Sequence, residues 1–283
     1  MSVLSKTEVK ALAKLLKASD DTTSQLIQEQ LHKLSTDTLI EVNNEIPSDD
    51  TDLKKYFLET VKKIKRKQLL NDFDEWVKNS NPDLEEGVFL VGLFNQPFFN
   101  KNYYSKKLDG WAKELNSFLE KIKIKKDPTS VINEVNHFLF MELGFKGSKK
   151  NYYDPENSFI DKVIDKRTGN PILLSVIYLL LAKRTKLSFL GVNMPAHFIV
   201  QYIDGLEPVY VDPFNCGEII TKDVCKERVT TLRLPWQEDY LSNPTTKQII
   251  ARMIQNLINI YHNEGEFELK EYLESYARVL KKV

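Results

Sequence analysis

Residues 171–184 read PILLSVIYLLLAKR, and this stretch decides the fold of the chain. Its side chains are apolar on every helical face except at Ser175, so the run is too apolar for a surface helix. Gly169 and Asn170 can turn and cap the chain before it, and Pro171 suits the first helical position, where no amide donor is needed. At 14 residues the run is shorter than the roughly 20 that span a bilayer. It therefore predicts a buried core helix.

Three runs with strand character follow this helix, at residues 187–192, 197–203 and 208–214. They predict a small antiparallel sheet that lies on the helix. A four-residue hairpin loop at 204–207 pairs Ile199 with Asp212. In that register His197 and Asp212 share one face, with backbones roughly 7 to 8 Å apart. The loop length therefore predicts a hydrogen bond between imidazole and carboxylate, whereas a slip of one residue would separate the two side chains.

Four segments in this order resemble the bacterial SirB-type family, which is described as transglutaminase-like with tetratricopeptide helices. They are YYDPENSF (152–159), KRTGNPILLSVIYLLLAKR (166–184), GVNMPAHFIVQY (191–202) and VYVDPFNCG (209–217). The resemblance covers roughly residues 85–262. It implies a papain-like core and a catalytic order of Cys, His and Asp, in which His197 and Asp212 match the last two positions.

One position departs from the family pattern. Catalytic members of the superfamily carry the nucleophilic Cys at the first turn of the buried helix, where the helix dipole favours thiolate. Here Pro171 or Ile172 occupies that place, and neither side chain is a nucleophile. We therefore expect a transglutaminase-like protein that lacks catalysis and serves as a protein-interaction or regulatory scaffold, with a protein partner.

The alternative is a hydrolase or acyltransferase in which Asp212 orients His197 as a general base. The base would act on water or on a substitute nucleophile, for which Ser175 and Cys216 are the candidates. Ser175 lies four residues after Pro171, on the same helix face but one turn deeper. Buried hydroxyls usually bond to a carbonyl instead. A structural role is also open for the pair, since Asp before Pro commonly forms a turn.

The segment 152–159 lacks regular periodicity and concentrates turn formers. It predicts a turn before the core helix. As a functional element, the same loop could line a cleft. The residues that we expect to line it are Tyr152, Tyr153, Asn157, Asn170 and Pro171.

Composition excludes several classes of protein. The chain has 283 residues with 40 basic and 40 acidic side chains, so no excess of positive charge indicates nucleic acid. The basic run KKIKRK (62–67) is expected to be a solvated helix face. Two cysteines and the absence of a signal-peptide core predict a cytoplasmic protein without disulfides. We expect no membrane span, no metal and no cofactor, and His137 is expected to be a packed residue without ligand spacing.

The predicted class is α+β and mostly helical, with three regions. Residues 1–80 form a helical region, 81–240 form the transglutaminase-like core and 241–283 form a tetratricopeptide-like helical hairpin. Within the core, 218–242 is expected to be a surface connection that Trp236 and Tyr240 pack down.

Overall fold

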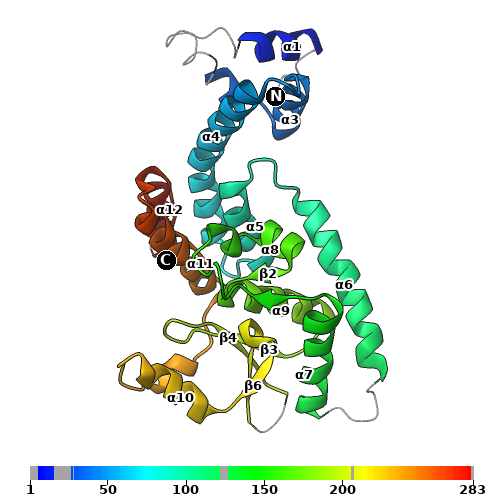
Figure 1. Cartoon of the computed structure of the whole chain (residues 1–283), viewed down its shortest axis with the longest axis vertical. Coiled ribbons are helices and arrows are strands. Elements are labelled where there is room, and N and C mark those ends of the chain that lie inside the picture. Colours follow the sequence, from blue (N-terminus) through cyan, green and yellow to red (C-terminus); the bar gives the residue numbers. More distant parts are fainter. Residues whose placement is uncertain (1–5, 16–26, 28, 122–126, 205–206, 282–283) are drawn as a thin grey trace.

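The computed structural model describes residues 6–15, 27, 29–121, 127–204 and 207–281. It shows a mostly helical α+β protein with one small four-stranded antiparallel sheet (Figure 1), which confirms the predicted class. The α-helices before the sheet are α1 (Lys6–Leu15), α3 (Thr36–Glu45), α4 (Thr51–Lys78), α5 (Leu84–Asn95), α6 (Lys101–Lys121), α7 (Pro128–Asn136), α8 (Ile160–Lys166) and α9 (Pro171–Thr185). The α-helices that follow the sheet in the sequence are α10 (Lys222–Thr231), α11 (Thr246–Glu264) and α12 (Phe267–Lys281).

The sheet has the strand order β3-β4-β5-β6. Its strands are β3 (Phe189–Val192), β4 (Ile199–Tyr202), β5 (Val209–Asp212) and β6 (Glu218–Ile220), and a separate parallel pair joins β1 (Lys146–Gly147) to β2 (Thr168–Gly169). Val200 lies opposite Val211. Tyr202 lies opposite Val209. This is the register that a four-residue loop predicts, so the predicted hairpin pairing is confirmed.

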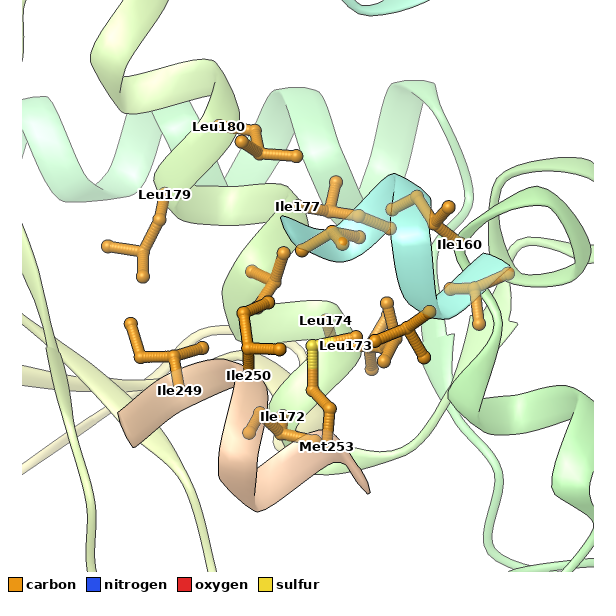
Figure 2. Close-up of a cluster of buried hydrophobic side chains, with 14 of the residues drawn as sticks. Ile160, Ile172, Leu173, Leu174, Ile177, Leu179, Leu180, Ile249, Ile250 and Met253 are labelled. Atoms are coloured by element: carbon orange, nitrogen blue, oxygen red, sulfur yellow. The ribbon is translucent and has the colours of Figure 1, made fainter. Parts of the chain in front are cut away.

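Helix α9 is the buried core helix that the sequence predicts. The Asn170 side chain caps it by accepting a hydrogen bond from the backbone N–H of Leu173 at 2.9 Å, and it ends at Lys186 in the left-handed conformation. Burying one Leu or Ile side chain contributes about 1.5–3 kcal/mol, so this helix supplies much of the core. Figure 2 shows its apolar side chains packed against those of α11 and α8: Ile249, Ile250, Met253 and Ile160.

The two faces of the sheet pack against different helices, because side chains alternate along each strand. Val200, Tyr202 and Val211 belong to the core that contains α9. Ile199 and Tyr210 belong to a second cluster that contains the buried side chains of α10. Both faces are therefore covered, and β4 is buried along its whole length.

The prediction for residues 218–242 was incomplete. This segment contributes β6, α10 and a short 3-10 turn at Glu238–Leu241 (η4), rather than a plain surface connection. A three-residue strand is too short to show alternation in the sequence. Trp236 and Tyr240 pack against the cluster under α10, as predicted.

Helices α11 and α12 form the predicted helical pair, with Gly265 in the left-handed conformation between them (φ 77°). The pair lies on α4 and α5 (Figure 1). The Tyr276 hydroxyl donates to the backbone carbonyl of Arg66 at 2.6 Å. One hydrophobic core contains residues of α4, α9 and both C-terminal helices. The boundaries near residues 80 and 240 stay predictions.

The basic run 62–67 is not a uniformly solvated face, which corrects the prediction. Arg66 is buried, and its Nε donates to the backbone carbonyl of Phe94 at 3.2 Å. Its guanidinium also lies 4.8 Å from the centre of the Phe94 ring. Lys63 pairs with Glu268 of α12. The helical period places Arg66 on the side of α4 that α5 and α12 cover.

His137 is half-exposed and its ring contacts that of Phe118, with centroids 5.9 Å apart, so the predicted packing is confirmed in part. Its Nε2 lies 3.1 Å from Oε1 of Glu142. The helix changes here from α to a π-helical turn, His137–Glu142 (η1). The buried residues Val131, Ile132, Val135, Phe138 and Leu139 recur at helical spacing, which leaves His137 on the opposite, outer side.

Candidate functional site

A histidine and an aspartate meet where the β4–β5 hairpin ends. Asp212 is the last residue of β5, and His197 lies just before β4. Nε2 of His197 is 2.9 Å from Oδ2 of Asp212, although within the described residues Nε2 makes no well-aligned hydrogen bond. The Asp212 side chain is fully buried, whereas that of His197 is 18% exposed. The shared face that the loop length predicts is therefore observed as a close contact.

Asp212 receives several donors in addition to His197. Its Oδ1 accepts from the backbone N–H groups of Phe214 (3.1 Å) and Asn215 (3.4 Å). Its Oδ2 accepts from the Asn215 side chain at 2.9 Å and from Arg228 of α10 at 2.5 Å. Burial raises the pKa of this carboxyl, but His197, Arg228 and Asn215 outweigh burial and hold the pKa well below its usual range. Asp212 is thus a carboxylate at neutral pH.

A tight turn before β4 fixes the backbone of His197. The His197 N–H donates to the carbonyl of Met194 at 3.3 Å, and Ala196 between them has a positive φ of 54°. The Arg252 guanidinium, which comes from α11, donates to the carbonyls of Met194 (3.2 Å) and His197 (3.5 Å). The same guanidinium donates to Oδ1 of Asn193 at 2.7 Å. Helix α11 therefore holds the turn that carries the histidine.

The first turn of α9 carries no nucleophilic side chain. Asn170 is the N-cap, Pro171 follows at the first helical position, and Ile172 is buried. The Asn170 side chain also donates to the buried Ser158 hydroxyl at 2.9 Å. The residues at this helix start therefore serve capping and packing.

The predicted loop before the core helix reaches the histidine through ring contacts. The Asn157 side chain donates to the Tyr152 carbonyl at 3.3 Å and fixes the loop. The Tyr152 ring lies edge-to-face with Phe214, with centroids 5.9 Å apart. Phe214 in turn lies edge-to-face with His197, at 6.1 Å. Tyr153 is 70% exposed. Tyr152 is thus close to the His197–Asp212 pair, while Tyr153 faces solvent.

Residues 102–255, just over half of the chain, match the family described as the transglutaminase-like superfamily. A UPF0162 protein of Xylella fastidiosa (strain 9a5c) is 31% identical over 189 residues, which are 64% of this chain and 66% of that protein. The chain belongs to the transglutaminase-like superfamily. Its UPF0162 relatives are bacterial and SirB-like.

Two further relatives of this transglutaminase-like chain are more distant. A UPF0162 protein of Pseudomonas aeruginosa is 24% identical over 192 residues, which are 65% of this chain and 67% of that protein. F-box only protein 21 of Mus musculus is 28% identical over 149 residues, which are 48% of this chain but 23% of that protein. The chain thus spans just under two thirds of the Xylella relative. No solved structure matches it.

The two candidate nucleophiles of this transglutaminase-like protein lie in different surroundings. Ser175 is fully buried in α9, and its hydroxyl donates to the backbone carbonyl of Phe198 at 3.1 Å. Cys216 is exposed and adopts a positive φ of 56° in the turn after β5. The Ser175 hydroxyl therefore supports the backbone beside His197, and of these two candidates only the Cys216 thiol is exposed.

Sequence patterns do not point to Arg228 or Arg252 as site residues. Each comes from a helix that lies far from His197 in the sequence, and a basic residue on an amphipathic helix is usually solvated. Arg252 alone carries a signal, because it interrupts the apolar run IIARMI at 249–254.

Within the described ranges, His, Cys, Asp and Glu side chains nowhere form a group of three that could hold a metal ion. None of the helices in the described part of the chain combines the length and apolarity that a membrane crossing requires.

Proposed function

We propose that this chain is a non-catalytic member of the transglutaminase-like superfamily that acts as a protein-interaction or regulatory scaffold. The observation that carries the proposal is the start of α9, where Pro171 and Ile172 stand in place of a nucleophile. The partner is a protein.

Acyl transfer through a covalent intermediate requires a thiolate or an activated hydroxyl beside the histidine. A helix N-terminus favours thiolate because its partial positive charge stabilises the anion. Pro171 has no ionisable group, and the Ile172 side chain is buried in the core. The dipole at the start of α9 therefore has no nucleophile to activate.

A structural role accounts for the retained pair. Asp212 joins His197, Arg228 and the turn after β5, so it connects the sheet to α10. Removing one partner of a buried ion pair is costly, at about 3–5 kcal/mol. A contact of this kind can therefore persist for a structural reason without catalysis.

The finer architecture supports the same proposal. We interpret α9 on the sheet as a papain-like core, and α11 with α12 as a tetratricopeptide-like hairpin. A single helical hairpin cannot bury its own apolar face. Here that face is covered by α4 and α5, so a partner would bind another surface of the chain.

The alternative function is a hydrolase or acyltransferase that uses His197 and Asp212 with water or a non-standard nucleophile. The partial exposure of His197 and the exposed Cys216 are the observations that favour it. Ser175 would first have to release the Phe198 carbonyl.

The proposal is tested with glutamine-containing peptides, by measuring the release of ammonia from them and the incorporation of an amine into them. We expect wild type and the variants His197→Ala and Cys216→Ser to give the same background rate. Turnover by wild type that disappears in His197→Ala would refute the non-catalytic function. Loss in Cys216→Ser as well would identify the nucleophile.

A further inference from the structure

Two arginines lie on different sides of the His197 turn, and their charges are balanced differently. Arg228 contacts two carboxylates: its Nη1 lies 2.5 Å from Oδ2 of Asp212, and its Nη2 lies 3.0 Å from Oε2 of Glu218. Among the described residues, Arg252 contacts neutral oxygens only, at the Asn193 side chain and at the carbonyls of Met194 and His197. The negative charges of the site thus neutralise Arg228.

Arg252 keeps a positive charge that the described residues do not neutralise. No described carboxylate lies within ion-pair distance of its guanidinium. The side chain is half-buried, and burial lowers its pKa. Removing a cation from water without a counter-charge is costly. Three neutral acceptors offset part of that cost, and a bound anion would offset the rest.

The surroundings of Arg252 fit a carboxylate carried by a peptide rather than a free inorganic ion. Tyr152 approaches the same histidine whose backbone carbonyl Arg252 binds. Its ring contacts Phe214, and Phe214 contacts His197. Tyr153 is the exposed neighbour of Tyr152, with ring centroids 5.1 Å apart. A cationic group thus stands beside an aromatic surface that continues to the histidine.

We propose that Arg252 and Tyr152 form a recognition subsite for a peptide carboxylate next to the His197–Asp212 pair. The guanidinium would bind the carboxylate, because charge-assisted hydrogen bonds to Arg are strong and geometrically specific. Tyr152 would pack against the neighbouring part of the peptide. The carboxylate is either an acidic side chain or a chain terminus. This inference rests on the proposed function, since it names the kind of partner that a non-catalytic site would hold.

The competing explanation is that Arg252 only ties down the turn at 193–197. The histidines offer a direct readout, because the chain contains just His32, His137, His197 and His262. Their imidazole C–H signals can be followed by NMR in the full chain at constant salt. His197 reports on the subsite, and the other three serve as internal controls.

Three N-acetylated peptides serve as probes: acetyl-Phe-Ala-Glu-amide, its Gln counterpart, and acetyl-Phe-Ala with a free terminal carboxylate. We expect a saturable shift of the His197 signal with at least one carboxylate peptide and at least about tenfold weaker binding of the Gln peptide, which is about 1.4 kcal/mol. Comparing the two carboxylate peptides distinguishes a side chain from a chain terminus. Equal binding of the Glu and Gln peptides, with no binding of the terminal carboxylate, would overturn the proposal, as would the absence of any shift.

Variants then test whether Arg252 and Tyr152 bind the peptide. We expect Arg252→Gln to lose at least about tenfold in affinity while Arg278→Gln, at an exposed arginine of α12, changes little. Tyr152→Ala leaves the turn at 193–197 intact and should also weaken binding, so the proposal remains testable if Arg252→Gln does not fold. Wild-type affinity in both site variants would refute it. Ammonia release is measured separately. A failure of the subsite proposal can therefore be distinguished from a failure of the proposal that the protein is non-catalytic.

Discussion

At the residue scale, two buried carboxylates illustrate opposite solutions to the cost of burying charge. Asp212 has no exposed surface, but His197, Arg228 and the turn after β5 stabilise its ionised form. Asp161 is 4% exposed, and its Oδ1 has no hydrogen-bond partner among the described residues. Burial therefore raises the pKa of Asp161, whereas the donors around Asp212 lower the pKa there.

Asp161→Asn should make the protein more stable at pH 7, by about 1 kcal/mol. A carboxyl group whose pKa is higher in the folded state than in the unfolded state binds its proton more tightly when the protein is folded. The stability that this protonation contributes is lost as the pH rises above the pKa of the unfolded state. The amide does not ionise and avoids this loss. Urea unfolding at pH 7 and pH 3 measures the effect. The gain should vanish at pH 3, where Asp161 is protonated in both states. A variant that is less stable than wild type at pH 7 would contradict this account of Asp161.

At the element scale, the turn after β5 connects the site to α7. Gly217 has a φ of 77°, and a Cβ added to it would lie within 2.5 Å of the Asn136 side chain. That side chain donates to the Gly217 carbonyl at 2.7 Å and accepts from Tyr178 of α9 at 3.3 Å. The turn that follows Asp212 is thus fixed against two helices.

Gly217→Ala should destabilise the protein by about 2 kcal/mol or more, because it combines backbone strain with a steric clash. Gly110→Ala is the matched control. Gly110 lies inside α6 with open space around it, so alanine there should stabilise the helix by about 0.5–1 kcal/mol. Thermal unfolding of both variants measures the difference. Equal effects of the two substitutions would show that the turn is not constrained as described.

The sequence predicts those parts of the site that depend on local geometry. The length of the segment 204–207, of which residues 205 and 206 lie outside the described residues, predicts the β4–β5 register that the strands show, and this register brings His197 to Asp212. Asn170 and Pro171 mark the start of α9 by their own chemistry. Arg228 and Arg252 could not be predicted in the same way, because their positions depend on how α10 and α11 pack against the sheet. Long-range packing leaves no pattern in the residues next to Arg228, and next to Arg252 it leaves only the interrupted apolar run at 249–254.

At the scale of the whole molecule, α11 and α12 close the core instead of forming an appendage. Ile250 and Met253 of α11 pack with α9 (Figure 2). Tyr276 of α12 stacks on Phe73 of α4, with ring centroids 5.0 Å apart. Helix α11 also carries Arg252 to the His197 turn. The site therefore depends on the C-terminal hairpin.

A chain that ends at residue 240 should not unfold cooperatively, because truncation exposes the apolar surfaces of α4, α5 and α9. Circular dichroism during heating and limited proteolysis measure this. A truncated chain with a sharp transition near that of the full chain would show instead that residues 241–283 form an independent unit.

The most direct test of the account is a double-mutant cycle on His197 and Asp212. The free energy of unfolding is measured for wild type, His197→Ala, Asp212→Ala and the double variant. If the pair is a structural contact in a non-catalytic scaffold, each substitution should cost about 2 kcal/mol or more, and the two should couple by about 1 kcal/mol. Variants as stable as wild type, or more stable, would contradict the account, because residues retained at a cost to stability are typical of a working active site.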